Sequence, residues 1–237
     1  RMNLIRQLPA LSAKTMDQRH IQLLSEHPAS NLPLFLSIAL EELRMFASFE
    51  QLEKRIHRFP QQTGKEGLEL LYQQVLQRLE KEIGKNAVSE PLSLLCCSSM
   101  GLKEREIQSL CPQVSKEQLA LLWRELRSHI QNKNGLLNFN HHTLKDAIEK
   151  QYLASFELKK QYHHQLAEFL IDLPDKKRRL AELLEHYHIC GITDQMQALL
   201  FKLENFLVLQ KESPEQLAVW WDKAGVQEPL NLLHESL

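Results

Sequence analysis

Hydrophobic residues in the N-terminal third of the chain recur at steps of three and four residues. One stripe contains Leu32, Leu36, Leu40 and Leu43, and a second contains Leu68, Leu71, Tyr72, Val75, Leu79 and Ile83. This spacing places each set on one face of an α-helix. The segment Phe59–Lys65 lies between the stripes, and its proline and glycine are typical of a loop. Residues 1–86 are therefore predicted to form a helical domain.

The next segment contains signals for three short helices. An apolar stretch from about Glu90 to Ser98 ends near Gly101, which is a favourable residue just beyond a helix. A second helix is predicted over Lys103–Leu110. Ser115, followed three residues later by Gln118, forms a capping-box pattern that predicts the start of a third helix.

A hairpin is predicted directly after the third helix. Asn134 and Gly135 both tolerate positive φ, and this pair favours a tight turn between two strands. Leu137 and Phe139 alternate with asparagines, as in a half-buried strand. Three helices followed by a hairpin predict a winged-helix domain over residues 87–150.

Residues 151–237 return to helical spacing. Pro174, Gly191 and Pro214 separate the predicted helices. Their stripes are Tyr162, Leu166, Phe169 and Leu170; Leu180, Leu183, Leu184 and Tyr187; and Met196, Leu199, Leu200, Leu203 and Phe206. The sequence shows no clean 34-residue repeat, so a helical arm is predicted, as a bundle or the start of an α-solenoid. The expected fold class is mainly α with one β-hairpin.

Composition and charge narrow the function classes. The 29 basic and 30 acidic residues nearly balance, and the third predicted helix carries both signs, which disfavours a nucleic-acid partner. No apolar run is long enough to span a membrane, and residues 1–9 do not resemble a signal peptide. The four cysteines lack metal-binding or redox spacing and are predicted to be buried thiols in a reducing compartment. A cytoplasmic protein is expected.

No catalytic motif is present in the sequence. Phosphate-binding glycine loops, nucleophile elbows and zinc-protease motifs are all missing, so neither an enzyme nor a catalytic residue is predicted. His186 and Cys190 share a helical face, but a metal would need two further ligands, and no metal site is predicted. His186 is expected to have a structural or surface role. His163 and His164 are interpreted as a pair on a helix surface.

Three stretches of the chain resemble the STAND class of NTPases, in its NACHT branch, which includes nephrocystin-3 and the telomerase-associated WD-repeat protein. Residues 31–46 are similar to the helix after the nucleotide-binding core. Residues 94–107 are similar to the start of the winged helix of that class, and residues 139–148 to its end. Residues 220–225 are similar to a W-x-K-A-G segment that follows the helical arm.

The resemblance implies a nucleotide-dependent switch that uses two residues of this chain. Pro33 would pack beside the adenine, and His141 would bind the β-phosphate of ADP and hold a closed state. From the residues alone, Pro33 is equally a proline that begins a helix, and His141 a capping or surface residue. His142 stands at a position where another branch of the class has aspartate.

The resemblance further implies a cofactor outside the chain. The fragment itself would hold none, whereas the full-length protein would bind ADP or ATP with Mg²⁺ in an upstream nucleotide-binding domain. The first functional hypothesis is thus a regulatory segment that couples the nucleotide state to domain opening and oligomerisation, through self-association or a protein partner. The alternatives are a protein-interaction scaffold and, less favoured, a DNA-binding winged-helix regulator.

Overall fold

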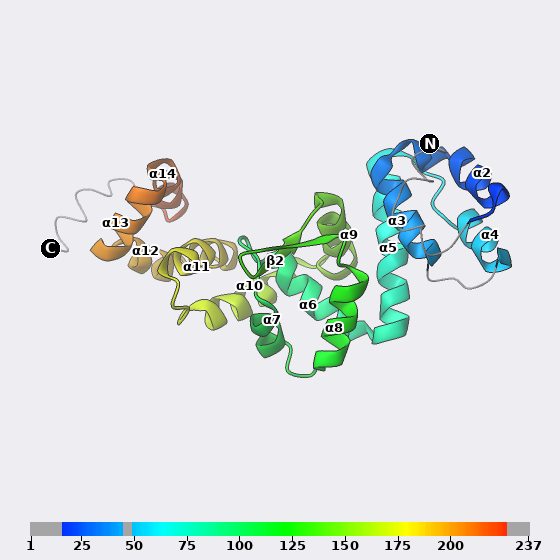
Figure 1. The fold of residues 1–237 in the computed structure, drawn as a ribbon. Coiled ribbons are helices and arrows are strands. Elements are labelled where there is room, and N and C mark those ends of the chain that lie inside the picture. The colour runs from blue at the N-terminus through cyan, green and yellow to red at the C-terminus, as the bar shows by residue number, and fades with distance from the viewer. Residues whose placement is uncertain (1–15, 45–48, 227–237) are drawn as a thin grey trace. The chain divides into compact units, whose positions relative to one another are not determined.

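The structure is a computed structural model that describes residues 16–44 and 49–226. These residues are mainly helical, with one small antiparallel sheet, as predicted (Figure 1). They divide into two compact units, residues 1–88 with 141–151 and residues 89–140 with 152–237. Met45, Phe46 and the N-terminal residues compared with a signal peptide lie outside the described ranges. The division into three domains stays a prediction.

The described residues of the first unit contain five helices and a short 3-10 turn. Its elements are α2 (Gln18–Glu26), η2 (Pro28–Asn31), α3 (Pro33–Arg44), α4 (Phe49–His57), α5 (Gly64–Ile83) and α9 (His142–Tyr152). The predicted stripe of α5 is buried along its whole length, and in α3 Leu36, Leu40 and Leu43 are buried. The predicted face of α5 is thereby confirmed, and so is that of α3 except for Leu32, which precedes the helix and is half-buried.

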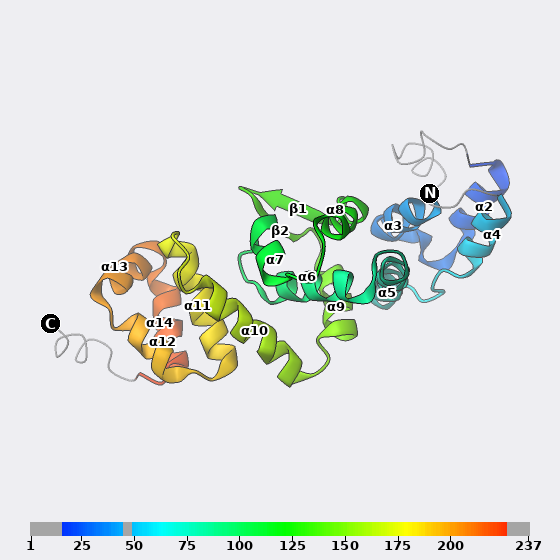
Figure 2. The ribbon, with the colours of Figure 1, turned by 90° about the horizontal axis from the view of Figure 1, so that it is seen from below.

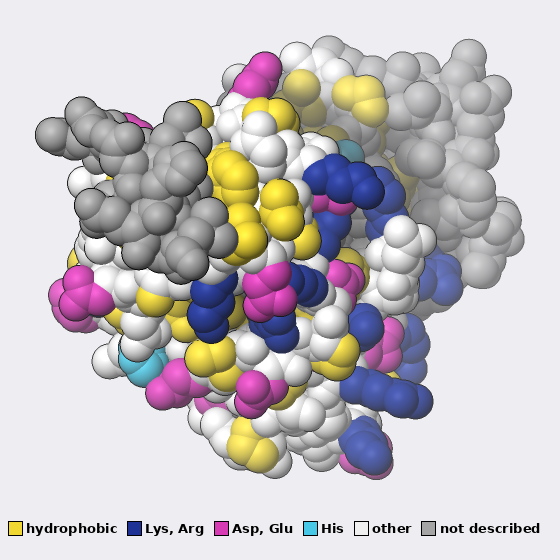
Figure 3. All heavy atoms as spheres, turned by 90° about the vertical axis from the view of Figure 1, so that its left-hand side faces the viewer, with side chains coloured by type: hydrophobic (Ala, Val, Ile, Leu, Met, Phe, Trp, Pro, Cys, Tyr) yellow, Lys and Arg dark blue, Asp and Glu magenta, His cyan; other side chains and the backbone are white. Residues whose placement is uncertain are grey.

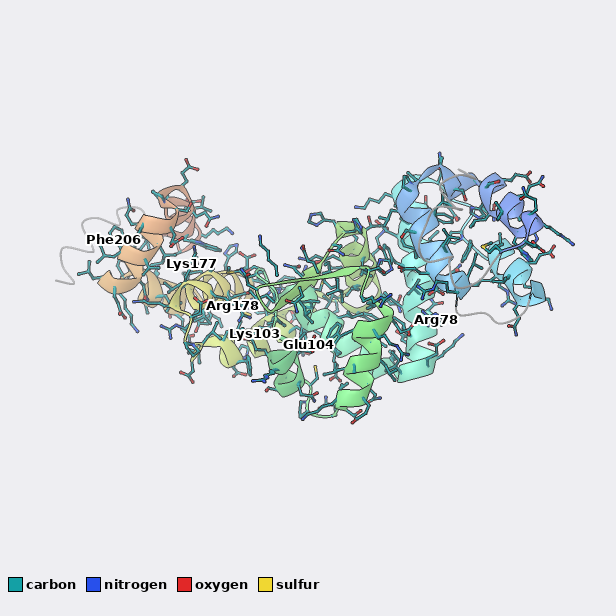
Figure 4. The ribbon with its side chains drawn as sticks, viewed as in Figure 1. Arg78, Lys103, Glu104, Lys177, Arg178 and Phe206 are labelled. Carbon is teal, nitrogen blue, oxygen red and sulfur yellow. The ribbon has the colours of Figure 1, made fainter. Side chains whose placement is uncertain are left out.

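A buried carboxylate joins three helices of the first unit. Glu42 of α3 accepts hydrogen bonds from Arg78 of α5, at 2.8 and 3.1 Å, and from Arg55 of α4, at 3.1 Å. Its side chain is only 4% exposed, so the two guanidinium groups compensate for the loss of hydration. Figure 4 shows where Arg78 projects from α5.

Helix α9 belongs to the first unit although it follows the hairpin in sequence. Lys65 of α5 forms an ion pair with Asp146 of α9 at 2.7 Å, and Lys150 pairs with Glu69. Leu144, Ala147 and Ile148 are fully buried on the inner face of α9. The segment that resembles the end of a winged helix therefore packs with α5.

The second unit begins with the predicted three helices and hairpin. The order is α6 (Lys85–Cys97), α7 (Glu104–Leu110), α8 (Lys116–Glu125), β1 (Ile130–Lys133) and β2 (Leu136–Phe139). Ser115 and Gln118 form the predicted capping box, and Asn134 and Gly135 make the turn with φ values of 56° and 82°. Helix α6 begins earlier than expected, at Lys85, and continues through Pro91.

Gly101 allows the hairpin to approach the segment that follows α6. Leu102 and Leu137 exchange two backbone hydrogen bonds, of 2.8 and 3.2 Å. A Cβ atom on Gly101 would lie 2.2 Å from the carbonyl oxygen of Leu137, and the φ of Gly101 is +89°. Only glycine fits this position without displacing the strand.

The helical arm completes the second unit. Its helices are α10 (Phe156–Leu170), α11 (Lys176–Cys190), α12 (Thr193–Leu200), α13 (Leu203–Glu212) and α14 (Pro214–Lys223). Figure 2 shows α10 and α11 side by side, and α11, α12 and α13 each contact the next helix in sequence. The third predicted stripe was expected to lie on one helix, but it is divided between α12 and α13. The chain turns at Phe201 and Lys202 between these helices. The Asn205 side chain donates a hydrogen bond across this turn to the carbonyl of Leu199, at 2.9 Å.

Candidate functional site

Helix α11 carries a row of polar side chains on a face that is buried. Arg178, Glu182 and His186 are spaced four residues apart and so lie on the same side of the helix. Glu182 and His186 are fully buried, and Arg178 is 3% exposed. Their partners come from α10, from α7 and from the loop between α6 and α7.

Glu182 binds the loop that follows α6. Its carboxylate accepts hydrogen bonds from Ser98 Oγ at 2.7 Å, from the backbone N–H of Met100 at 2.8 Å and from that of Ser99 at 3.1 Å. The N–H of Gly101 donates to Ser98 Oγ at 2.9 Å. Three consecutive N–H groups and one hydroxyl of the loop are therefore satisfied, directly or through Ser98, by one carboxylate.

These hydrogen bonds decide the ionisation of Glu182. Burial alone would raise the pKa of this carboxyl group, but the adjacent His186 imidazole and the hydrogen bonds from Ser98 and Met100 outweigh burial and lower its pKa to about 2. Glu182 is thus an anion at neutral pH, held by donors that stabilise only the charged form. The protein's own carboxylate occupies the cluster of N–H groups.

Arg178 makes the second connection between α11 and the loop. Its guanidinium donates to both carboxylate oxygens of Glu106, at 2.7 and 2.6 Å, and to the carbonyl of Gly101 at 3.0 Å. Glu106 also accepts from the N–H of Lys103, at the start of α7. Burial would raise the pKa of Glu106, but the bonds from Arg178 and Lys103 hold it below its usual value. Figure 4 labels Arg178 on α11.

The third member of the row connects α11 to α10. His186 Nε2 lies 3.3 Å from the Glu182 carboxylate, and its Nδ1 lies 2.9 Å from Nδ1 of His163. His163 is 2% exposed, so its interpretation as part of a surface pair was wrong, whereas His164 is exposed as expected. A structural or surface role was expected for His186, and its complete burial excludes the surface.

An open groove borders this network. It encloses about 480 Å³ and lies between the loop and helices α11, α13 and α14. Met100, Val219 and Trp220 give the groove apolar surface, and the Lys223 ammonium lies 4.4 Å from the centre of the Trp220 ring. The polar side chains of its lining include Ser99, Glu185, Lys177 and Lys223.

The two predicted nucleotide contacts both lie in the first unit. Pro33 is the first residue of α3 and is exposed. It follows η2, which His27 caps by accepting from the N–H of Ala29 at 3.3 Å. His141 precedes α9, is exposed, and accepts from the N–H of Leu144 through its carbonyl at 3.2 Å. Both roles stay predictions.

Other sequence-based expectations concern cysteines, metal and membrane. All four cysteines are buried and free, as predicted. Within residues 16–44 and 49–226, no group of three or more histidine, cysteine or acidic side chains is arranged to hold a metal ion. In the same ranges no helix combines the length and apolar character needed to cross a bilayer.

Comparison with known proteins gives distant relatives. The chain is 24% identical over 209 residues to a TPR repeat-containing protein of Dictyostelium discoideum, a match that covers 86% of this chain and 12% of that protein. It is 30% identical over 114 residues to telomerase protein component 1 of Rattus norvegicus and 29% identical to that of Mus musculus. Each of these two matches covers 46% of this chain and 4% of the relative. No family model and no solved structure matches the chain.

These similarities support part of the expected relationship. A telomerase-associated protein was among the proteins that the sequence motifs resemble, and weak similarity to such a protein is found. The chain spans about an eighth of one relative and 4% of the others. Membership of the NACHT branch stays a prediction.

Proposed function

We propose that this chain is a non-catalytic protein-interaction segment of the scaffold type. The observation that carries the proposal is α13, a helix with five large apolar side chains of which none is buried, while its one buried residue is Asn205. Large apolar side chains left exposed together on one helix mark a surface that another protein can cover. Similarity to a TPR repeat-containing protein supports this function.

The buried row of α11 gives the scaffold its rigidity. Arg178 and Glu182 fix the arm to the loop between α6 and α7 through charge-assisted hydrogen bonds, which are stronger than neutral ones. A fixed arm presents α13 and α14 in one orientation. Because a preorganised surface loses less conformational entropy on binding, this rigidity favours association.

The scaffold proposal is tested by quantitative co-purification of the full-length protein from cells. Leu207→Glu in α13 and Val219→Glu in α14 place a charge on side chains that are 57% and 52% exposed. We expect both variants to lose a defined set of partner proteins while the fold is unchanged. Leu121→Glu, which alters an exposed leucine of α8, is the matched control. An identical partner set for all four proteins contradicts the proposal.

The second candidate is the regulatory segment of a STAND-type NTPase. One observation favours it: Pro33 and His141 are both exposed and belong to the same compact unit. A nucleotide bound to a core domain outside these 237 residues could therefore reach both side chains. A charge-assisted bond from His141 to a phosphate would contribute about 2 kcal/mol to the closed state.

Retention of ADP by the full-length protein tests the switch. His141→Ala should lower bound ADP and raise the open, assembled population roughly thirtyfold, because an energy difference of about 2 kcal/mol is lost. His142→Ala is the control, since His142 is also exposed and begins α9. Equal ADP content and assembly in wild type and His141→Ala contradict the switch.

A further inference from the structure

Helix α13 presents a stripe of apolar side chains on the face opposite its buried residue, Asn205. Leu203, Phe206 and Leu207 follow the spacing i, i+3 and i+4, so they share one face, and Asn205 on the opposite face is 3% exposed. Leu203 is 45% and Leu207 57% exposed. Figure 3, which looks onto this end of the chain, shows hydrophobic side chains gathered at the surface, and Figure 4 shows Phe206 on α13.

The charges that flank the stripe are self-complementary. Glu204 and Lys211 are seven residues apart, so they lie on the same flank of α13, two turns from each other. When two identical helices pair antiparallel about a two-fold axis, the same flank of each helix meets that of the other in reversed order. An axis near Leu207 therefore places Glu204 of each copy beside Lys211 of the other.

From this stripe and its flanking charges we infer that α13 pairs with α13 of a second copy of the same chain. The inference deepens the proposed interaction role and rests on it. Leu203, Phe206 and Leu207 of the two copies form the apolar seam, and the two Glu204–Lys211 pairs fix the antiparallel orientation. Glu204 also pairs with Lys176 at 2.8 Å, but that contact is exposed and weak, so it does not prevent a second partner.

Sedimentation equilibrium of the 237-residue chain tests the inference. The wild type should form a concentration-dependent dimer, and Leu207→Glu should weaken the dimer about a hundredfold because two charges enter the apolar seam. Phe156→Glu is the control, since Phe156 of α10 is 65% exposed but lies outside α13. This control should dimerise like the wild type.

Charge reversal separates the proposed pairing from a general apolar contact. Glu204→Lys and Lys211→Glu should each weaken dimerisation about tenfold, because each sets like charges opposite each other. The double variant, and a mixture of the two single variants, should both recover wild-type affinity. A wild type that stays monomeric, or a double variant no tighter than the singles, overturns the inference. A monomer that still loses partners through Leu207→Glu in cells leaves the proposed scaffold function standing.

Discussion

Replacing Glu182 with glutamine tests whether one buried carboxylate holds the arm to the rest of the second unit. The substitution preserves shape but exchanges one acceptor oxygen for an amide nitrogen that donates. That nitrogen would face the N–H of Ser99 or of Met100, both of which donate to Glu182 in the native structure. A buried donor without an acceptor costs about 1–3 kcal/mol.

The lowered pKa of Glu182 gives a second estimate of how much this substitution destabilises the fold. A value of about 2 in place of 4.5 means that the folded state favours the charged form by about 3 kcal/mol, since one pH unit is worth about 1.4 kcal/mol. We therefore expect Glu182→Gln to lower the free energy of unfolding of the second unit by about 3 kcal/mol at pH 7. The pKa is lowered in the folded state, so this stability is present above pH 4.5 and is lost as the pH falls toward 2.

Urea denaturation followed by tryptophan fluorescence measures this difference. Trp123, Trp220 and Trp221 are the three tryptophans of the chain and all belong to the second unit, so the signal reports on that unit. The difference between wild type and variant should shrink to about half at pH 3. Glu185→Gln is the control, because Glu185 is one-third exposed and only approaches Lys223, at 3.9 Å. Equal effects of the two substitutions, or a difference that does not change with pH, refute the reasoning.

Three further predictions address other parts of the chain. Gly101→Ala should destabilise the protein more than Gly135→Ala in thermal denaturation, since both have positive φ but only Gly101 would bring a Cβ against the carbonyl of Leu137. Burial lowers the pKa of His27, so the unfolded chain binds a proton at this side chain more readily than the folded chain does. The melting temperature should therefore fall as the pH drops below 6.5. His27→Asn should reduce this pH dependence in the same thermal denaturation. The isolated chain should neither hydrolyse ATP nor bind ADP at micromolar concentration in calorimetry, because its sequence lacks a phosphate-binding loop.

Local sequence patterns predicted the features that depend on neighbouring residues. The capping box at Ser115, the turn at Asn134 and Gly135, and the apolar face of α5 each involve residues within a few positions of one another. The split between α12 and α13 was missed because Leu200 and Leu203 keep helical spacing across the turn. There the backbone N–H of Asn205 and of Phe206 both donate to the carbonyl of Lys202, and a new helix begins.

The buried network was missed because its partners are distant in sequence. Ser98 and Glu182 are 84 residues apart, and Glu106 and Arg178 are 72 apart. Charged side chains on a helix usually face solvent, so the charges of α11 gave no indication of burial. One signal was present in the sequence. Arg178, Glu182 and His186 recur at four-residue spacing beside the apolar stripe, so they share one face of α11, next to its buried side.

The network also limits how the arm can move in any function of the chain. Arg178 binds the carbonyl of Gly101 and Glu182 binds the N–H of Met100, so both faces of the loop backbone are held from α11. Separating α11 from the loop would leave a buried carboxylate and a guanidinium without partners. The loss of partners for buried charges strongly destabilises a fold. Rotation of α11 relative to this loop is therefore disfavoured.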